Sequence, residues 1–274
     1  MKETYTIVTG AGGSIGQAIT RALASEGRNV IMACRNIAKD TPLCEEINSK
    51  YPGKVRIMQL DLASLDSVAN FAHELRNADI EIDTLINNAG IMLKEHKTTQ
   101  QGIEMTIGVN FVGTYLLTHL LTPAIKRGGH ITFTTSLTRF IGKVDQDFFD
   151  LTPHNYGRFK AYSRSKLATT MLTAHLSHEL APQGIHVNAG DPGIVDTGMI
   201  RMDAWFDPIA DRLFRPIIST PEQGAVSALT ASASNVNGHI FEKTRHHDIP
   251  SKWHNHPHWQ WLLNETKRIV APWL

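Results

Sequence analysis

An alternation of short β-rich runs with longer segments of helical pattern is the feature that most constrains this fold. The β-rich runs span residues 4–9, 29–34, 55–60, 84–87, 130–135, 185–189 and 239–241. They lack strict polar–apolar alternation, which is typical of strands whose two faces are both covered by helices. The pattern therefore predicts one α/β domain over residues 1–274, built on a doubly wound, mostly parallel sheet with helices on both faces.

The composition favours a single domain that binds a small molecule. The 274 residues are 42% hydrophobic, which is enough for a core without disulfides or metals. The net charge is +1 with both signs interspersed, which argues against nucleic acid or an anionic membrane as a partner. No apolar run reaches the length of a signal-peptide core or a membrane span. The two cysteines, Cys34 and Cys44, suit reduced thiols, so we expect a cytoplasmic protein.

A glycine-rich turn follows the first β-rich run and precedes a helical pattern over residues 14–25. Glycines let the backbone turn tightly and approach a pyrophosphate at the N-terminus of the next helix. The alternative is an ordinary strand–helix turn without a ligand. The position after the first strand favours a dinucleotide site of the Rossmann type. The residues expected to contact the cofactor here are Gly10, Gly12, Gly13, Ser14, Ile15 and Gly16.

The second β-rich run ends at Arg35 and Asn36, where an acidic residue would accept hydrogen bonds from an adenosine ribose. A guanidinium at this place suits a ribose 2′-phosphate in geometry and charge. The sequence therefore favours NADP over NAD. The alternative is that Arg35 is a solvated surface charge.

Two further runs end in polar or small residues at the same predicted edge of the sheet. These are Asp61 with Leu62, and Asn88 with Ala89 and Gly90. Ligands bind at the carboxyl ends of strands in open α/β sheets, so both sets are candidates for cofactor contacts. Taken alone, Asp61 is better interpreted as a helix cap and the second set as an ordinary turn.

Tyr162 and Lys166 lie four residues apart in a segment of helical pattern and therefore share one helix face. A tyrosine has a pKa near 10, and a neighbouring ammonium lowers it by stabilising the phenolate. Such pairs also occur by chance on helix surfaces. Two other residues give this pair a context, namely Ser136 at the end of the fifth run and Asn110 in the helical segment 106–117.

These residues resemble the short-chain dehydrogenase/reductase superfamily, whose tetrad is Asn, Ser, Tyr and Lys in this order. The glycine turn, the Asn87–Gly90 motif and a Pro-Gly segment after the sixth run also match, so the resemblance covers nearly the whole chain. Residues 83–92, 108–117 and 162–168 look most like the branch of retinol dehydrogenases and WW-domain oxidoreductases. The Pro-Gly segment adds Pro192, Gly193, Val195 and Thr197 as expected cofactor contacts.

The resemblance implies hydride transfer between a nicotinamide and a carbonyl or alcohol substrate. Tyr162 would exchange the proton with the substrate oxygen, and Ser136 would hydrogen-bond that oxygen. Lys166 would tune Tyr162 and hold the nicotinamide ribose, Asn110 would position a water, and Thr197 would meet the carboxamide. The branch does not specify the substrate, because its members accept varied alcohols and carbonyls.

Two features depart from the family pattern. Ser14 replaces a glycine of the family motif. With this serine the glycine-rich turn resembles that of nucleotide-sugar epimerases and dehydratases, so such an activity is a rival function. The 25 residues between Ser136 and Tyr162 exceed the usual spacing, which predicts an insertion near 138–160. Its aromatic residues either pack against the domain, which we favour, or line a substrate entrance. A substrate lid is expected near 199–217 and includes Trp205.

Several alternatives remain open at this stage. A segment rich in His and Trp, residues 244–261, lacks metal-ligand spacing, so no metal site is expected and the tryptophans are assigned to packing or a subunit interface. A second class of function is a dinucleotide-binding sensor or scaffold without catalysis. A homo-oligomer is common in the superfamily, but the insertion would obstruct the helix face usually used for assembly.

Overall fold

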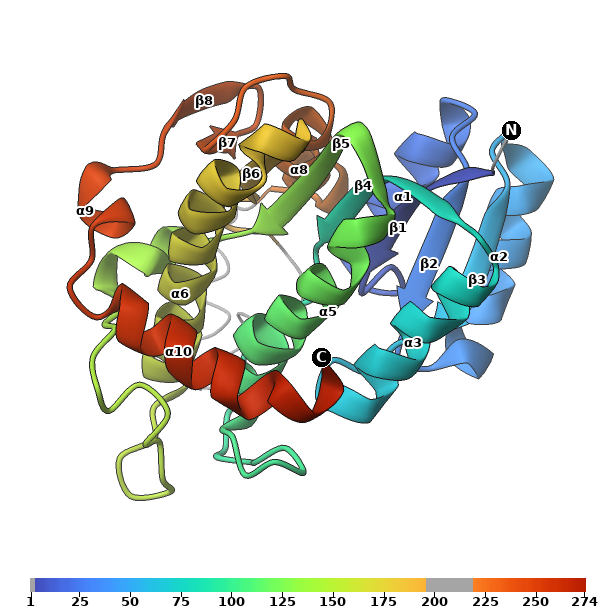
Figure 1. Cartoon of the computed structure of the whole chain (residues 1–274). Helices are drawn as coiled ribbons and strands as arrows, with labels where there is room; N and C mark the ends of the chain where they lie inside the picture. Colours follow the sequence, from blue (N-terminus) through green and yellow to red (C-terminus); the bar gives the residue numbers. More distant parts are fainter. Residues whose placement is uncertain (1–2, 196–218) are drawn as a thin grey trace.

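The computed structural model describes residues 3–195 and 219–274. Its centre is an eight-stranded sheet with the strand order β3-β2-β1-β4-β5-β6-β7-β8. All neighbouring strands are parallel except β7 and β8, which pair antiparallel. Helices lie on both faces of the sheet (Figure 1). The predicted fold class, a doubly wound single domain, is confirmed.

The strands lie close to the predicted runs. They are β1 (Thr4–Thr9), β2 (Val30–Cys34), β3 (Val55–Gln59), β4 (Glu81–Asn87), β5 (Ile125–Thr134), β6 (His186–Asp191), β7 (His239–Glu242) and β8 (Arg245–Asp248). The largest difference is β5, which begins five residues before the predicted run. Two glycines in this stretch, Gly128 and Gly129, hide the strand in the sequence. The register between β4 and β5 shifts there, so the extra residues form an irregularity at the start of the strand.

The helices are distributed over the two faces. They are α1 (Ser14–Ser25), α2 (Ile37–Lys50), α3 (Leu65–Asn77), α4 (Met105–Ile107), α5 (Thr114–Leu121), α6 (Arg158–Glu179), α8 (Pro221–Ser232), α9 (Ser251–His254) and α10 (Trp259–Val270). Caps fix where several begin. Asn36 accepts a hydrogen bond from the Lys39 amide at α2, and Thr220 with Gln223 forms a capping box at α8.

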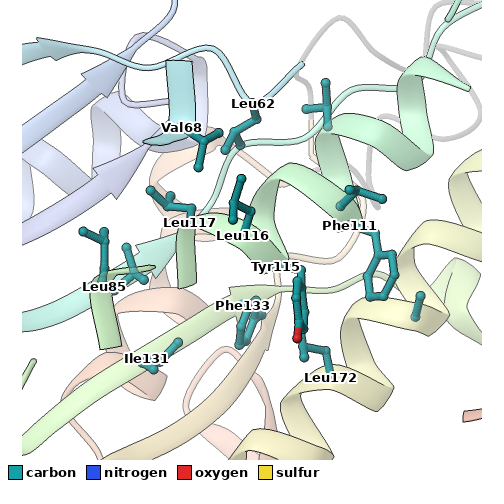
Figure 2. Close-up of a cluster of buried hydrophobic side chains, with 14 of the residues drawn as sticks. Leu62, Val68, Leu85, Phe111, Tyr115, Leu116, Leu117, Ile131, Phe133 and Leu172 are labelled. Carbon is teal, nitrogen blue, oxygen red and sulfur yellow. The ribbon is translucent and has the colours of Figure 1, made fainter. Parts of the chain in front are cut away.

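A large apolar core lies between the sheet and helices α3, α5 and α6. Figure 2 shows Leu85, Ile131 and Phe133 from the central strands facing Leu116 of α5 and Leu172 of α6. All five side chains are fully buried. A second cluster under α1, α2 and α8 covers the other face. Burial on both faces explains why the strands lack polar alternation.

The segment predicted as one helix over residues 106–117 is divided into three parts. A π-helical turn, η1 (Gly108–Gly113), separates α4 from α5. A close approach accounts for Gly113, because a Cβ there would lie 2.2 Å from the Leu62 carbonyl oxygen. Insertions of this kind in helices often mark functional sites, and here the turn carries Asn110.

The long segment before α6 packs against the domain. It starts with a 3-10 helix, η3 (Leu137–Ile141), and continues as a loop beside the 91–104 loop (Figure 1). Phe148 is fully buried and meets Phe111 with ring centroids 5.8 Å apart. The Tyr156 hydroxyl donates to the Leu93 carbonyl at 2.6 Å. Packing therefore accounts for Phe148 and Tyr156, whereas Phe140 and Phe159 stay about half exposed.

The segment rich in His and Trp is more regular than predicted. Its first part is strand β8, whose side chains are all exposed, and α9 and the start of α10 follow. The sequence of β8 shows no alternation of polar and apolar residues, because this edge strand has no apolar face to bury. Trp253 and Trp259 are buried in the main core, which confirms their assignment to packing. Among residues 3–195 and 219–274, no group of His, Cys, Asp or Glu is arranged to hold a metal ion.

Helix α10 crosses the outer side of α6 and α5 and ends near α3 (Figure 1). The Trp259 and His175 rings lie 5.5 Å apart, and the Trp273 indole donates to Asp66 of α3 at 2.7 Å. Helix α10 therefore packs on the outer side of α6, and the predicted effect of the insertion on assembly stays a prediction. In the part of the chain that the structure describes, no helix is long and apolar enough to cross a membrane.

We predict that Phe148→Ala lowers the free energy of unfolding by about 3–5 kcal/mol, because it leaves a cavity beside Phe111. Phe159→Ala is the matched control, since Phe159 is 47% exposed, and it should cost less than about 1 kcal/mol. Urea denaturation measures both values. Equal losses in the two variants would show that the insertion does not contribute to the core.

Candidate active site

A cleft of about 470 Å³ runs along the carboxyl edge of the sheet and collects the cofactor contacts predicted in the segments after β1 to β4, whereas Tyr162, Lys166 and the Pro-Gly segment do not belong to its lining. It is formed by the segments that follow β1, β2, β3 and β4. Its lining comprises Gly10, Gly12, Gly13, Ser14, Ile15, Gly16, Ala33, Cys34, Arg35, Asn36, Lys39, Asp40, Leu60, Asp61, Leu62, Asn88, Ala89, Gly90, Ile91 and Val109. The volume and the converging backbone suit an extended ligand.

The glycine turn is shaped by close backbone contacts. Gly10 has φ +62°, and a Cβ there would lie 2.9 Å from the Ala89 Cα. A Cβ on Gly16 would lie 2.2 Å from the Gly10 carbonyl oxygen. The first residue requires a left-handed backbone and the second a close approach, so both positions need glycine. The N-terminus of α1 is thereby exposed to the cleft, where its amides can meet an anion.

The end of β4 is tied to the end of β1. The Asn88 side chain donates to the Thr9 carbonyl at 2.9 Å, and the Ala89 amide donates to the Thr9 hydroxyl at 2.9 Å. These bonds hold Gly90 at the centre of the cleft. Asn88 therefore stabilises the local turn, which was one of its two predicted functions, and it also lines the cleft.

Arg35 and Lys39 provide positive charge at one end of the cleft. Both side chains are exposed, and neither forms an ion pair within the described residues. Lys39 lies in the first turn of α2, whose N-cap is Asn36. Two unpaired cations beside a helix N-terminus favour binding of a phosphate group. Lys39 was not identified from the sequence, although its place four residues after Arg35 could have suggested it.

Asp61 is not the cap of α3. That cap is Ser64, which accepts a hydrogen bond from the Ser67 amide at 3.3 Å. The Asp61 carboxylate instead accepts one from the Ala63 amide at 3.0 Å, which makes a local turn. Asp61 and Leu62 remain at the cleft, where one carboxylate oxygen stays available for a ligand.

Ser136, Tyr162 and Lys166 come together where β5 ends against α6. The Ser136 hydroxyl lies near enough to the Tyr162 hydroxyl to lower the pKa of Tyr162. The Lys166 ammonium lies 5.5 Å from the centre of the Tyr162 ring and donates to the Thr134 carbonyl at 2.7 Å. Ser136 caps η3, and Lys166 is 3% exposed. The structure thus places these three predicted catalytic residues in one group.

Burial dominates the protonation of this group. It raises the pKa of Tyr162 to about 12, against which the nearby Ser136 hydroxyl acts. Burial also lowers the pKa of Lys166 to about 8, while the Asp191 carboxylate acts in the opposite direction. This differs from the expectation that Lys166 would lower the pKa of Tyr162. The reason is that burial, the largest influence on Tyr162, outweighs the ammonium, which donates to the Thr134 carbonyl and lies 5.5 Å from the ring centre.

Asn110 and Lys166 both lie close to Gly90 of the cleft. Its side chain donates to the Ile91 carbonyl at 2.9 Å and to the Ser165 hydroxyl at 3.0 Å, and it accepts from the Ile91 amide at 2.8 Å. A Cβ on Gly90 would lie 3.4 Å from the Lys166 ammonium and 3.6 Å from the Asn110 amide oxygen. Gly90 therefore leaves room where these two polar side chains converge.

The Pro-Gly segment is fixed by a buried ion pair that the sequence did not indicate. Asp191, at the end of β6, pairs with Arg139 of η3, and both side chains are almost fully buried. The other Asp191 oxygen accepts from the Gly193 amide at 2.9 Å. The pair therefore connects the segment after Ser136 to Pro192 and Gly193. Reading the sequence could not find it, because the partners are 52 residues apart.

Of the remaining predicted contacts, Val195 is buried and bridges to Ser219. Thr197, the lid near 199–217 and Trp205 lie outside the described residues. Ile194 and Leu137 are 41% and 50% exposed, and they directly follow the Pro-Gly segment and Ser136. Apolar side chains thus lie next to the polar group.

The fold and this site define an oxidoreductase, and the chain belongs to the short-chain dehydrogenase family, whose model matches residues 4–204. Family members of this kind act between alcohol and carbonyl groups with a nicotinamide dinucleotide. Mouse retinol dehydrogenase 13 is 34% identical over 251 residues, covering 87% of this chain and 75% of that protein. Human polyprenol dehydrogenase is 32% identical over 253 residues, covering 87% and 76%.

A solved structure agrees with this assignment. It is a protein from Beutenbergia cavernae described as an NAD(P)-dependent gluconate 5-dehydrogenase, with NADP bound at low occupancy. It superposes with a TM-score of 0.70 at 26% identity, covering 92% of this chain and 97% of that one.

We predict that Lys166 makes stability depend on pH between about 8 and 10.5. In this window the unfolded chain binds more protons at this side chain than the folded chain, because its pKa falls from 10.5 to about 8 on folding. The free energy of unfolding should therefore rise with pH relative to that of Lys166→Met, by up to about 3 kcal/mol.

Urea denaturation at a series of pH values measures this difference. Lys160→Met, which removes an exposed lysine from the same helix, should show no such slope relative to the wild type. Parallel pH curves for wild type and Lys166→Met would contradict the burial of an ammonium at this position.

Proposed function

We propose that the protein is an NADP-dependent reductase of carbonyl compounds, and in reverse a dehydrogenase of alcohols, with Tyr162 as the proton donor and acceptor. The observation that supports this most is the grouping of Tyr162 and Ser136 with the Lys166 ammonium, which lies beside Gly90 of the dinucleotide cleft. A reduced nicotinamide, when bound, supplies the hydride to the carbonyl carbon.

The chain's own residues handle the proton and the developing charge. The Ser136 hydroxyl donates to the substrate oxygen and orients it toward Tyr162. Tyr162 transfers its proton to this oxygen as negative charge develops, and the Lys166 ammonium stabilises the resulting phenolate. A proton from solvent then restores the phenol, with Asn110 beside the path that we propose.

The pKa of Tyr162 supports reduction as the favoured direction at neutral pH. With a pKa of about 12, the phenol holds its proton and is ready to act as an acid. Alcohol oxidation requires the phenolate, so this direction should gain rate as the pH rises toward 12. Loss of the Lys166 ammonium above pH 8 opposes this gain, because the phenolate then lacks its cation.

The preference for NADP is supported by the charges at the adenosine end of the cleft. Arg35 and Lys39 are exposed cations without ion-pair partners among the described residues, and both line the cleft. A ribose 2′-phosphate would interact with both at once. The Beutenbergia structure with NADP at low occupancy is consistent with this choice.

We propose an apolar alcohol or carbonyl compound as the substrate. Leu137 and Ile194 are exposed large apolar side chains next to Ser136 and the Pro-Gly segment. Retinol and polyprenol, after which the two relatives are named, are both long apolar alcohols. An apolar substrate would cover this surface and remove it from water.

The two cysteines are consistent with a cytoplasmic enzyme that keeps its thiols reduced, as we propose. Both Cys34 and Cys44 are free and buried. We also propose that the chain does not dimerise through α5 and α6, because α10 crosses both helices near one end and would obstruct a flat contact (Figure 1). A homo-oligomer would need another surface.

Tyr162→Phe should reduce turnover by at least about 100-fold, because the substrate oxygen loses its proton donor. The Kd for NADPH should change by less than about threefold, since the ring and the Lys166 ammonium remain. The assay follows NADPH absorbance with a panel of apolar aldehydes, ketones and quinones, and fluorescence titration gives Kd. Cofactor binding without Tyr162-dependent turnover across the panel would instead favour the dinucleotide sensor.

The wild type should bind NADPH more tightly than NADH. Arg35→Asp should reverse this order, because a carboxylate repels the 2′-phosphate and accepts hydrogen bonds from a ribose hydroxyl. Lys39→Ala should weaken NADPH about 3- to 10-fold and leave NADH nearly unchanged. Fluorescence titration with both cofactors gives all six constants. Tighter binding of NADH by the wild type would contradict the proposed function of the two cations.

A further inference from the structure

Asp40 is a buried carboxylate inside the dinucleotide cleft. It lies in the first turn of α2 and is 8% exposed, yet it belongs to the cleft lining. Its carboxylate lies directly against the glycine turn, because a Cβ on Gly12 would be 2.2 Å from the nearer Asp40 oxygen. Gly12 and Asp40 therefore occupy complementary space. Neither the sequence motifs nor the proposed function accounts for an acid at this place.

The local contacts leave this carboxylate able to accept further hydrogen bonds. Burial raises the pKa of the Cys34 thiol to about 12, and the nearby Asp40 carboxylate adds to this shift. The thiol therefore keeps its proton and acts as a donor. A thiol is a weak donor, and an ionised carboxylate can accept about four hydrogen bonds. A buried carboxyl group with such weak compensation points to a stronger donor in the bound state.

The position of Asp40 identifies the chemistry of this donor. Asp40 lies against Gly12 of the phosphate-binding turn, directly follows Lys39 in α2, and lines the same cleft as Arg35. Phosphate groups at neutral pH offer acceptors only, so they cannot be its partner. The ribose of the adenosine half carries hydroxyl donors between the phosphates and the base. In NADH the ribose has two such hydroxyls, and in NADPH the 2′-phosphate leaves one.

We propose that Asp40 accepts a hydrogen bond from a hydroxyl of the adenosine ribose and thereby sets how well the enzyme binds NADH relative to NADPH. This inference rests on the proposed binding of a nicotinamide dinucleotide in the cleft. It places the acidic group not at the end of β2, where Arg35 stands, but one helical turn further along, where it reaches back to Gly12. The pocket then holds a carboxylate for ribose hydroxyls and two cations for a 2′-phosphate.

The charges make a clear distinction between the cofactors. Asp40 favours NADH, because both hydroxyls are donors and no phosphate is present. For NADPH it is partly unfavourable, since the 2′-phosphate carries up to two negative charges near the carboxylate. Arg35 and Lys39 offset this repulsion. Replacement of Asp40 should therefore weaken the binding of NADH and leave that of NADPH unchanged or tighter, which a purely structural residue would not do.

The test measures Kd for NADH and NADPH by fluorescence titration of the full chain. Asp40→Ala removes the acceptor and should weaken NADH about 10- to 100-fold, the range expected for a hydrogen bond to a charged group. Asp40→Asn keeps the shape and one carbonyl acceptor, so its loss of NADH affinity should be smaller. Both variants should bind NADPH within about threefold of the wild type or more tightly. The NADH-to-NADPH ratio of Kd values is the decisive readout.

Glu45→Gln is the matched control. It removes a negative charge from an exposed position of the same helix outside the cleft, so the ratio should not change. Equal weakening of both cofactors in the Asp40 variants, or an unchanged NADH affinity, would overturn the inference. If the wild type binds neither cofactor, the proposed function fails first. If it binds both and only the ratio fails to respond, the inference alone fails.

Discussion

The burial of the Lys166 ammonium against the end of β5 is the constraint on which the catalytic end of the molecule depends. A buried cation needs an acceptor, and the Thr134 carbonyl provides it at 2.7 Å. This bond sets α6 against the strand and brings Tyr162 to Ser136. The same burial lowers the pKa of Lys166 to about 8 and raises that of Tyr162 to about 12. Positioning and protonation therefore share one physical cause.

The rest of the cleft is organised by contacts between segments that follow neighbouring strands. Thr9 holds Asn88 and Ala89, Arg139 pairs with Asp191, and Asn110 holds Ile91. Each contact joins the end of one element to the next, so the carboxyl edge is one connected polar layer above an apolar core. The buried pair of Arg139 and Asp191 is costly to desolvate, and the rings of Phe140 and Trp253 lie 4.5 and 5.9 Å from its guanidinium. It fixes geometry rather than adding net stability.

The sequence predicted most of the strands and the residues of the cleft, because periodicity and glycine turns are local signals. It misjudged elements whose pattern is set by distant packing. The π-helical turn that carries Asn110 packs closely against the Leu62 carbonyl at Gly113. Helical periodicity in the sequence does not reveal such a contact. Strand β8 is entirely exposed and therefore carried no apolar alternation. Lys39, Asp40 and the Arg139–Asp191 pair escaped notice because their relevance depends on neighbours across the cleft.

The sequence by itself determined the fold class, the positions along the chain of the strands that carry the site, and the identity of the residues at their ends. These properties follow from local periodicity and from residues whose chemistry is specific, such as the glycines before α1 and the Tyr162 and Lys166 spacing. Only the tertiary structure decided how those residues meet. It placed the Lys166 ammonium on Thr134 and the Asp40 carboxylate against Gly12. Desolvation and close contact depend on elements far apart in the chain, so no local pattern contains them.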